Sequence, residues 1–352
     1  NMAYTTIDDS SAFFQTKIYT GTGSENALTF DGNSNLQPDF VWGKQRNGTN
    51  QHHIHDSVRG ATKRMRADST DAEDTQAQGL KSFDSDGFTM GTASFVNAND
   101  DTYVGWGWKC EAAFSNDASS TSIGSIDSSG KANDTAGFSI VTYTGTGSNG
   151  TIKHGLSTAP KMIITHQIAG GEWYVYHAGG ASDAETDYLN LHVNAAAADD
   201  AEMWNDTAPT TSVFSVGVNG NTNGSSDPTI AYCFSDIKGY SKMGQYTGNG
   251  ATDGVFIFTG FKAAFIMIKR TNAASNWNMY DNKRLGYNAA NQNLVANTTG
   301  TDDAGNPIDI LSNGFKLRNS DVSANADGSN YIFMAFAEHP MTTSSGVPTT
   351  AR

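Results

Sequence analysis

The sequence predicts an all-β fold made of three tandem, pseudo-equivalent β-sandwich units of jelly-roll-like type. A Gly-rich signature, YTGTG, occurs at residues 19–23 and 143–147, and its variant YTGNG occurs at 246–250. Each signature is followed by short apolar and aromatic stretches that come in one order at nearly one spacing. Clusters of Gly, Asn, Asp and Ser separate these stretches, as expected for strands joined by turns.

Four landmark positions define the repeat. The stretches PDFVWGKQR, PKMIITHQ and AAFIMIKR place Phe40, Met162 and Phe265 at 21, 19 and 19 residues after the signature tyrosine. Three later landmarks keep the same register within three residues. They are Asp56, His177 and Asp281, then Phe88, Phe214 and Phe315, and finally Trp108, Phe234 and Phe336. We therefore interpret the chain as three copies of a unit of roughly 100 residues, and we expect each copy's aromatic and methionine landmarks to form a separate core.

The spacing of the signatures sets the expected boundaries. The first two signatures start 124 residues apart and the last two start 103 apart, and the excess falls in a Ser/Asp/Gly-rich stretch with the composition of a flexible linker. The prediction is a first repeat at 1–111, a linker at 112–135, a second repeat at 136–238, a third repeat at 239–340 and a C-terminal tail at 341–352.

Local signals support strands over helices. Asp86-Gly87 and Asn313-Gly314 occupy equivalent places in the first and third copies and favour hairpin turns. The second copy lacks such a pair. Only residues 61–74 and 194–204 have a composition that could form short helices.

Charge and composition exclude several classes of partner. The chain carries 36 acidic and 22 basic Asp, Glu, Lys and Arg residues, a formal net charge of −14. Such a surface repels a phosphate backbone, so we expect no nucleic-acid partner, and no apolar run is long enough to predict membrane insertion. The start of the sequence has no signal-peptide pattern, which predicts synthesis in a cytoplasm. Cys110 and Cys233 occupy near-equivalent places in different copies, so we expect two unbridged, buried thiols.

The apparent catalytic and cofactor motifs fail when the copies are compared. GTGSNG at 145–150 fits a dinucleotide-binding pattern, but its counterparts GTGSEN and GNGATD do not fit it. DSDG at 84–87 lacks the distal Glu of a calcium loop. We expect the acidic pairs at 100–101, 199–200 and 302–303 to be solvated in turns. No cofactor and no enzymatic activity are predicted.

The stretch HHIHD at 52–56 is the most metal-like pattern in the chain. On a strand, His53 and His55 would share one face at a spacing that transition-metal ligands can use. In the other copies the same places carry WYVYH and WNMYD. The histidines therefore read primarily as replacements for other flat side chains, and a metal site at His53 and His55 remains the weaker alternative.

Tryptophans are the candidate ligand contacts. Exposed indoles can stack on sugar rings, which makes Trp42, Trp173, Trp204 and Trp277 candidates for glycan contact. Core packing is the competing interpretation for each of them. A polysaccharide depolymerase would instead need two converging carboxylates, and the sequence places no such pair.

Several longer phrases carry a family resemblance. LQPDFVWGKQRN, HDSVRGATK, FDSDGFTMG, AYCFSDIKGYSKMG, DILSNGFKLR and YIFMAFAEHP, together with the signatures, resemble a repeat family of virion structural or tail-fibre-like proteins from tailed phages of marine bacteria. The resemblance runs over nearly the whole chain. It implies a virion component that is made in the host bacterial cytoplasm, and it implies no catalytic residues.

Together these features predict a phage virion structural protein, a subunit of a tail fibre or tail appendage that contacts the host surface. The expected partners are other copies of the chain in a homo-oligomer, other virion proteins and a host surface glycan. Two alternatives stay open. One is a capsid decoration or head-fibre protein, and the other is a carbohydrate-binding module or polysaccharide depolymerase.

Overall fold

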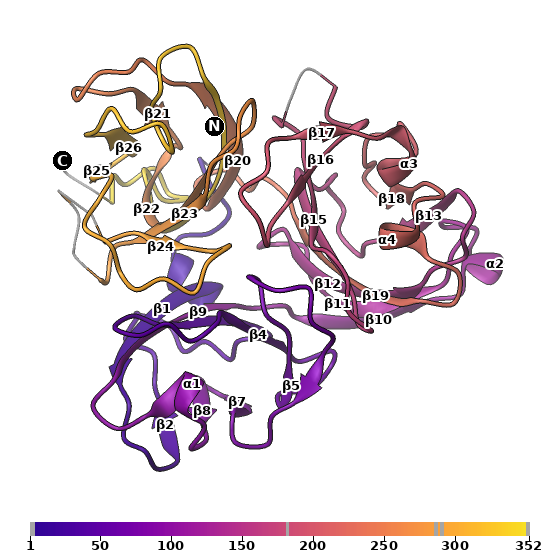
Figure 1. The fold of residues 1–352 in the computed structure, drawn as a ribbon, viewed down its shortest axis with the longest axis horizontal. Coiled ribbons are helices and arrows are strands. Elements are labelled where there is room, and N and C mark those ends of the chain that lie inside the picture. Colours follow the sequence, from indigo (N-terminus) through magenta and orange to yellow (C-terminus); the bar gives the residue numbers. More distant parts are fainter. Residues whose placement is uncertain (1–3, 181–182, 285–287, 289–291, 350–352) are drawn as a thin grey trace.

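The computed structural model describes residues 4–180, 183–284, 288 and 292–349. Strands make up 42% of the structure and helices 6%, which confirms the prediction of an all-β fold. Figure 1 shows three lobes around a common centre, with the chain passing through them in sequence order. Each lobe contains one larger antiparallel sheet, called its main sheet below, and one small sheet.

The first lobe contains the indigo and purple strands of Figure 1. Its main sheet has the order β1-β9-β3-β4. The small sheet has the order β2-β8-β7, and β5 and β6 form a separate pair. The elements are η1 (Ser10–Ala12), β1 (Phe14–Thr20), β2 (Asn26–Leu28), β3 (Phe40–Gln45), β4 (His53–Asp56), β5 (Lys63–Arg64), β6 (Asp74–Thr75), β7 (Leu80–Asp84), β8 (Gly87–Met90), α1 (Ser94–Asn97) and β9 (Thr102–Trp108).

The second lobe has the widest sheet, with the order β10-β11-β12-β19-β14-β15-β16-β17, and a small sheet of β13 and β18. Its elements are β10 (Ala112–Asn116), α2 (Ala118–Thr121), β11 (Ser128–Asn133), β12 (Phe138–Thr144), β13 (Gly150–Lys153), β14 (Met162–Gln167), β15 (Tyr174–His177), β16 (Asp187–Asn190), β17 (Ala198–Asp199), α3 (Ala201–Trp204), β18 (Val213–Val216), α4 (Gly220–Asn223) and β19 (Pro228–Phe234).

The third lobe has a main sheet of order β20-β27-β22-β23-β24 and a small sheet of order β21-β26-β25. Its elements are β20 (Ser241–Thr247), β21 (Phe256–Phe258), β22 (Phe261–Arg270), β23 (Trp277–Asp281), β24 (Leu294–Val295), β25 (Ile308–Leu311), β26 (Gly314–Leu317) and β27 (Asn330–Pro340).

The three main sheets share one strand order and one register. In each lobe the strand that ends in the signature lies beside the last long strand, which lies beside the strand of the first landmark. The last landmark pairs with the first landmark in each case: Trp108 with Phe40, Phe234 with Met162, and Phe336 with Phe265. The pairings Phe40 with Asp56, Met162 with His177, and Phe265 with Asp281 are also equivalent.

The signature turn is fixed by a buried asparagine in each lobe. The side-chain oxygens of Asn97, Asn223 and Asn325 accept the backbone N–H of Thr22, Thr146 and Asn249 at 2.8, 2.8 and 3.0 Å. Each side-chain NH₂ group donates to one backbone carbonyl in or just after the signature and to one that follows the small-sheet strand β8, β18 or β26. The signature is therefore a structural clamp.

The main sheets use both faces because side chains alternate along a strand. On β3, Phe40 and Trp42 face a hydrophobic core shared by all three lobes, whereas Val41 faces the first lobe's own core. Ring pairs cross every boundary in the shared core. They are Phe40 with Tyr232 (4.7 Å), Trp108 with Phe265 (5.6 Å) and Phe234 with Phe336 (5.9 Å).

The prediction of three separate cores is wrong for this reason. Of the landmarks, only Phe88 and Phe214 lie in cores that belong to a single lobe. The other members named above lie in the shared core: Phe40, Trp108, Met162, Phe234, Phe265, Phe315 and Phe336.

The expected linker at 112–135 is also corrected. Residues 112–116 and 128–133 form β10 and β11, which extend the second lobe's main sheet beyond β12. Their Ser- and Gly-rich sequence resembles a linker because edge strands with a solvated face need few apolar side chains. Backbone hydrogen bonds join β11 to β12 and β10 to β11, which holds both strands in the sheet.

The local predictions had mixed outcomes. Residues 61–74 form no helix and supply β5 and the first residue of β6, whereas 194–204 end in the short helix α3. Both predicted hairpins exist, but Gly87 and Gly314 are the first strand residues after their turns. A Cβ on these glycines would lie 1.9 Å from Leu28 O and 2.0 Å from Ile257 O. Glycine is needed there because a third strand passes close by.

Ring N–H groups at one equivalent position join the lobes into a closed circle. The residue lies directly before or at the start of the equivalent strands β4, β15 and β23. It is His52 in the first lobe, Trp173 in the second and Trp277 in the third. Each donates to a backbone carbonyl of a neighbouring lobe. The pairs are His52 Nε2 with Val295 O (3.0 Å), Trp173 Nε1 with Arg66 O (2.8 Å) and Trp277 Nε1 with Asn190 O (2.8 Å). The first lobe thus binds the third, the second binds the first, and the third binds the second.

The second landmark of each lobe makes a further contact across the boundaries. The buried carboxylate of Asp56 accepts the Tyr232 hydroxyl at 2.8 Å, and that of Asp281 accepts the Trp106 indole N–H at 3.0 Å. In the second lobe, His177 Nε2 instead lies 3.2 Å from Phe333 O. Every boundary between lobes is therefore closed by a buried polar contact as well as by ring packing.

Candidate functional site

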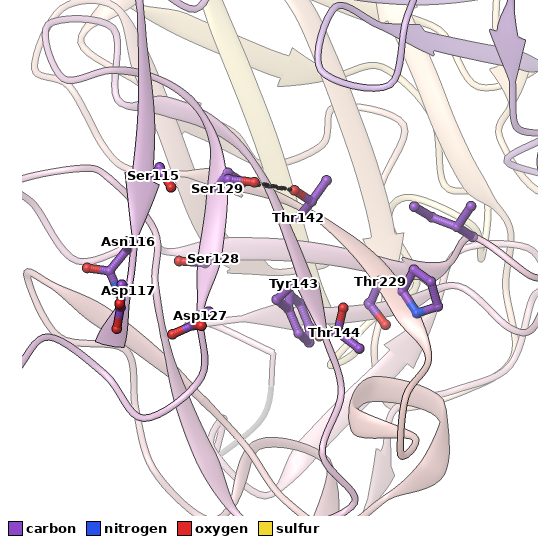
Figure 2. A pocket seen from close by; sticks show the side chains of 12 residues that line it. Ser115, Asn116, Asp117, Asp127, Ser128, Ser129, Thr142, Tyr143, Thr144 and Thr229 are labelled. Atoms are coloured by element: carbon purple, nitrogen blue, oxygen red, sulfur yellow. Dashed lines mark hydrogen bonds between the residues drawn. The ribbon is translucent and has the colours of Figure 1, made fainter. Parts of the chain in front are cut away.

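A polar groove crosses the second lobe where β10, β11, β12 and β19 lie side by side. Figure 2 shows hydroxyl, amide and carboxylate groups along it. The groove has a volume of about 320 Å³, within the range of small-molecule sites. It is lined by Ser115, Asn116, Asp117, Asp127, Ser128, Ser129, Thr142, Tyr143, Thr144, Ile168, Pro228 and Thr229.

The polar groups of this groove are held by local hydrogen bonds. Asp117 caps α2, and its Oδ1 accepts the Ser120 N–H at 3.1 Å. Asp127 Oδ1 accepts the Ala118 N–H at 2.8 Å, which fixes the start of the same helix. The hydroxyls of Ser129 and Thr142 lie 3.0 Å apart across β11 and β12, as the dashed line in Figure 2 marks. A preformed rim of fixed polar groups results.

A second groove lies at the corresponding place in the third lobe, at its boundary with the second. Its volume is about 750 Å³. Strand register makes Gln245, Thr247 and Asn330 the counterparts of Thr142, Thr144 and Pro228, which line the first groove. The remaining lining residues are Gly179, Gly180, Asp187, Ala197, Tyr246, Thr271, Asn272 and Tyr331.

The first lobe has an arginine at the corresponding place. Arg46 is the counterpart of Ile168 and Thr271, because each residue directly follows the same point of the third main-sheet strand. Its guanidinium donates to Asp302 Oδ2 at 2.7 Å and to Gln292 Oε1 at 2.9 Å in the third lobe. At this position the first lobe therefore forms an ion pair with the third lobe, whereas the second and third lobes carry the neutral side chains of Ile168 and Thr271.

The two grooves are acidic or neutral in character. Neither lining contains Lys, Arg or His among the described residues. In the larger groove, burial and the nearby Asp199 and Asp183 raise the pKa of Asp187. Arg270 lies beside the larger groove, where its Nε donates to Asn272 Oδ1 at 3.0 Å. A neutral ligand with many hydroxyls would meet both donors and acceptors in either groove.

The predicted metal candidates lie away from both grooves, in the first lobe. His53 and His55 are buried with their ring centroids 5.3 Å apart. His55 Nδ1 lies 2.8 Å from Ala61 O, and burial lowers the pKa of His55 to about 3. No cluster of three His, Cys, Asp or Glu side chains suited to a metal occurs among the described residues. The pair therefore lacks a third protein ligand there.

Packing accounts for the His53 position. A Cβ on Gly43 would lie 2.2 Å from the His53 ring, so the glycine on the adjacent strand makes room for the imidazole. The ring also packs edge-on against Phe95 at 5.5 Å. These contacts support the interpretation of a flat side chain in a core.

The four tryptophan candidates are all buried, which corrects the expectation that they could contact a glycan. Trp42, Trp173, Trp204 and Trp277 are exposed by 3% or less. Besides the two inter-lobe indole bonds already described, Trp42 Nε1 donates to His52 Nδ1 at 2.9 Å and Trp204 Nε1 donates to Asp187 O at 3.1 Å. A sugar cannot stack on rings that the core encloses. Sequence reasoning also missed the groove residues, because the Ser/Asp-rich stretch beside β12 resembled a linker.

Cys110 and Cys233 are free and buried, as expected. Cys110 lies in the shared core and Cys233 in the second lobe's own core, so the two thiols face different interiors. Burial raises the pKa of both thiols. Neither is a reactive thiolate at neutral pH.

Comparison with known proteins defines the family of the chain. No curated protein matches it. Across the described residues, no helix is long and apolar enough to cross a membrane. A family model described as a domain of unknown function, DUF7483, matches residues 9–340, which span all three lobes. The chain therefore belongs to the DUF7483 family.

Proposed function

We propose that this protein is a structural subunit of a phage virion and that it forms part of a tail fibre or tail appendage that contacts the host surface. The observation that carries the proposal is the closed circle of three lobes, joined by ring N–H donors at one equivalent position. A body closed in this way suits a mechanical role, because each lobe is held by two others. The sequence resemblance to tail-fibre-like virion proteins supports the same role.

We further propose that the lobes are three copies of one β-sandwich unit. Shared strand order, equivalent landmark pairings and the repeated asparagine clamp support this interpretation. In this view each unit packs one face of its main sheet on its own small sheet and the other face on its two neighbours. The chain then has the pseudo-threefold form that a trimer of separate subunits would have.

Contacts with other virion proteins and with further copies of the chain would use exposed apolar side chains. Phe256 and Phe258 are 43% and 49% exposed and lie on β21, an edge strand of the small sheet. Their counterparts in the first lobe are Ala27 and Thr29, because Leu28 and Ile257 pair with the equivalent Phe88 and Phe315. Exposed phenyl rings on an unpaired strand edge are typical of a protein contact.

Immunogold labelling of intact virions tests the location. Antibody raised against the native protein should mark the tail end of the particle. Label spread evenly over the head would refute the tail assignment and favour capsid decoration, and absence of the protein from purified virions would refute the structural role. A reaction product released from host polysaccharide by the purified protein would favour the enzymatic alternative.

A further inference from the structure

We propose that the groove between the second and third lobes binds a neutral, hydroxyl-rich glycan. The inference rests on the proposed contact with the host surface and identifies the ligand class and the site. It concerns a surface that none of the tryptophan candidates reaches, since all four are buried.

The lining chemistry favours a polyhydroxylated ligand. Gln245, Asn272 and Asn330 contribute three side-chain amides, and Thr247 contributes a hydroxyl. Each of these groups contains both a donor and an acceptor, as each sugar hydroxyl does. The Asp187 carboxylate adds a strong acceptor beside them. A neutral sugar can satisfy these groups without bringing a charge that needs a partner.

The charges around the groove disfavour anionic sugars. No Lys, Arg or His belongs to its described lining, and the Arg270 guanidinium beside it donates to Asn272 Oδ1 at 3.0 Å, whereas Asp187 has Asp199 and Asp183 as acidic neighbours. The whole chain carries a net charge of −14, which adds to the repulsion. Sialylated, sulfated or phosphorylated glycans would therefore bind more weakly than a neutral glycan of the same size.

The three lobes provide an internal comparison. Two of them leave an open groove at this position, and in the first lobe Arg46 occupies the place of Thr271 and forms an ion pair with a neighbouring lobe. The larger groove has walls from two lobes, because Gly179 and Asp187 face β20 of the third lobe across it. Gly179 allows this approach, since a Cβ there would lie 3.2 Å from Gln245 Cβ.

Two variants fill the groove in different ways. Thr271→Arg introduces the side chain that the first lobe carries at the equivalent position, with Asp187 among the groove residues it can pair with. Gln245→Arg places a cation at an exposed strand position and therefore carries little risk to folding. Ser24→Arg, on an exposed turn of the first lobe, adds the same charge away from the groove and serves as the control.

The experiment is binding of the full chain to an array of bacterial surface glycans that contains matched neutral and acidic members. We expect binding to neutral members, at least a tenfold loss in both groove variants, and unchanged binding in Ser24→Arg. Equal loss in Ser24→Arg, preference for acidic members, retention of binding in Gln245→Arg, or no binding to any member would each overturn the proposal. Virion labelling is unaffected by such a result, so failure of the glycan site is distinguishable from failure of the virion role.

Discussion

The hydroxyl of Tyr232 allows the contact between the first two lobes to be measured. Tyr232→Phe removes the 2.8 Å hydrogen bond to Asp56 and the longer 3.4 Å bond that the hydroxyl accepts from Arg59, and it keeps the ring packed on Phe40 at 4.7 Å. Asp56 retains the Arg59 guanidinium at 2.6 Å and two backbone N–H groups, so its charge stays partnered. The cost should therefore be close to that of one hydrogen bond to a charged group, about 2 kcal/mol.

This cost converts into a modest change in melting temperature. The entropy of unfolding is about 2 cal/mol/K per residue, so 2 kcal/mol corresponds to about 3 °C for a chain of 352 residues that unfolds as one unit. Differential scanning calorimetry at neutral pH measures both the shift and the number of transitions. The shared core predicts one transition.

Tyr188→Phe is the matched control, because Tyr188 lies at partial exposure in the second lobe and packs on Tyr174 within that lobe. It should change the melting temperature by less than 1 °C. Equal melting temperatures for the two variants would show that the inter-lobe hydroxyl contributes nothing. Two well-separated transitions in the unmodified protein would refute the argument that the lobes share one core.

Three further predictions test other features. Asn223→Ala should lower the free energy of unfolding by about 3 kcal/mol or more in thermal or urea unfolding, because three hydrogen bonds of the buried clamp are lost. Replacing Asn97 or Asn325 by Ala should cost a similar amount. A cost below about 1 kcal/mol would contradict the role of the asparagine as a clamp. Burial lowers the pKa of His177 to about 4, below its ordinary value of 6.5, so its contribution to stability should be present above pH 6.5 and be lost as the pH falls through 4. The melting temperature of His177→Gln should therefore fall less steeply over this pH range than that of the unmodified protein. Identical slopes would exclude His177 as a cause of the pH dependence. Phe258→Glu should leave the melting temperature within about 1 °C because the ring is half exposed, yet it should reduce self-association in sedimentation analysis. An unchanged assembly state would exclude β21 as the contact between copies of the chain.

The strand positions could be predicted from the sequence because similar landmarks recur three times and so locate each strand three times. Aligned landmarks such as Phe40, Met162 and Phe265 occupy the same register in their sheets. A single copy would have left strand and turn assignments ambiguous, since short apolar runs are compatible with several structures.

The shared core could not be predicted in the same way. Val41 and Trp42 are neighbours in one apolar run, and only the direction of each side chain decides which core it enters. A main sheet buried on both faces has no polar face to mark which neighbour covers it. The same ambiguity explains the four tryptophans, because the sequence cannot distinguish an aromatic residue on a solvated face from one on a covered face.

The groove between the second and third lobes was equally hidden from sequence reasoning. Gln245 and Asp187 are 58 residues apart and line one groove only because the second and third lobes pack against each other. Neither residue belongs to a motif. Their shared location depends on how whole sheets are placed, which no local pattern encodes.

The strands β10 and β11 affect the orientation in which the protein can bind a threefold-symmetric partner. A body with three similar sides could be attached to a threefold-symmetric partner in three rotational settings of nearly equal energy. Among the described strands, β10 and β11 extend the second lobe's main sheet past β12, whereas the equivalent strands β1 and β20 are edge strands in the other two lobes. Strands β10 and β11 make the second lobe unlike the other two, so a partner that contacts β10 would bind the protein in a single rotational orientation.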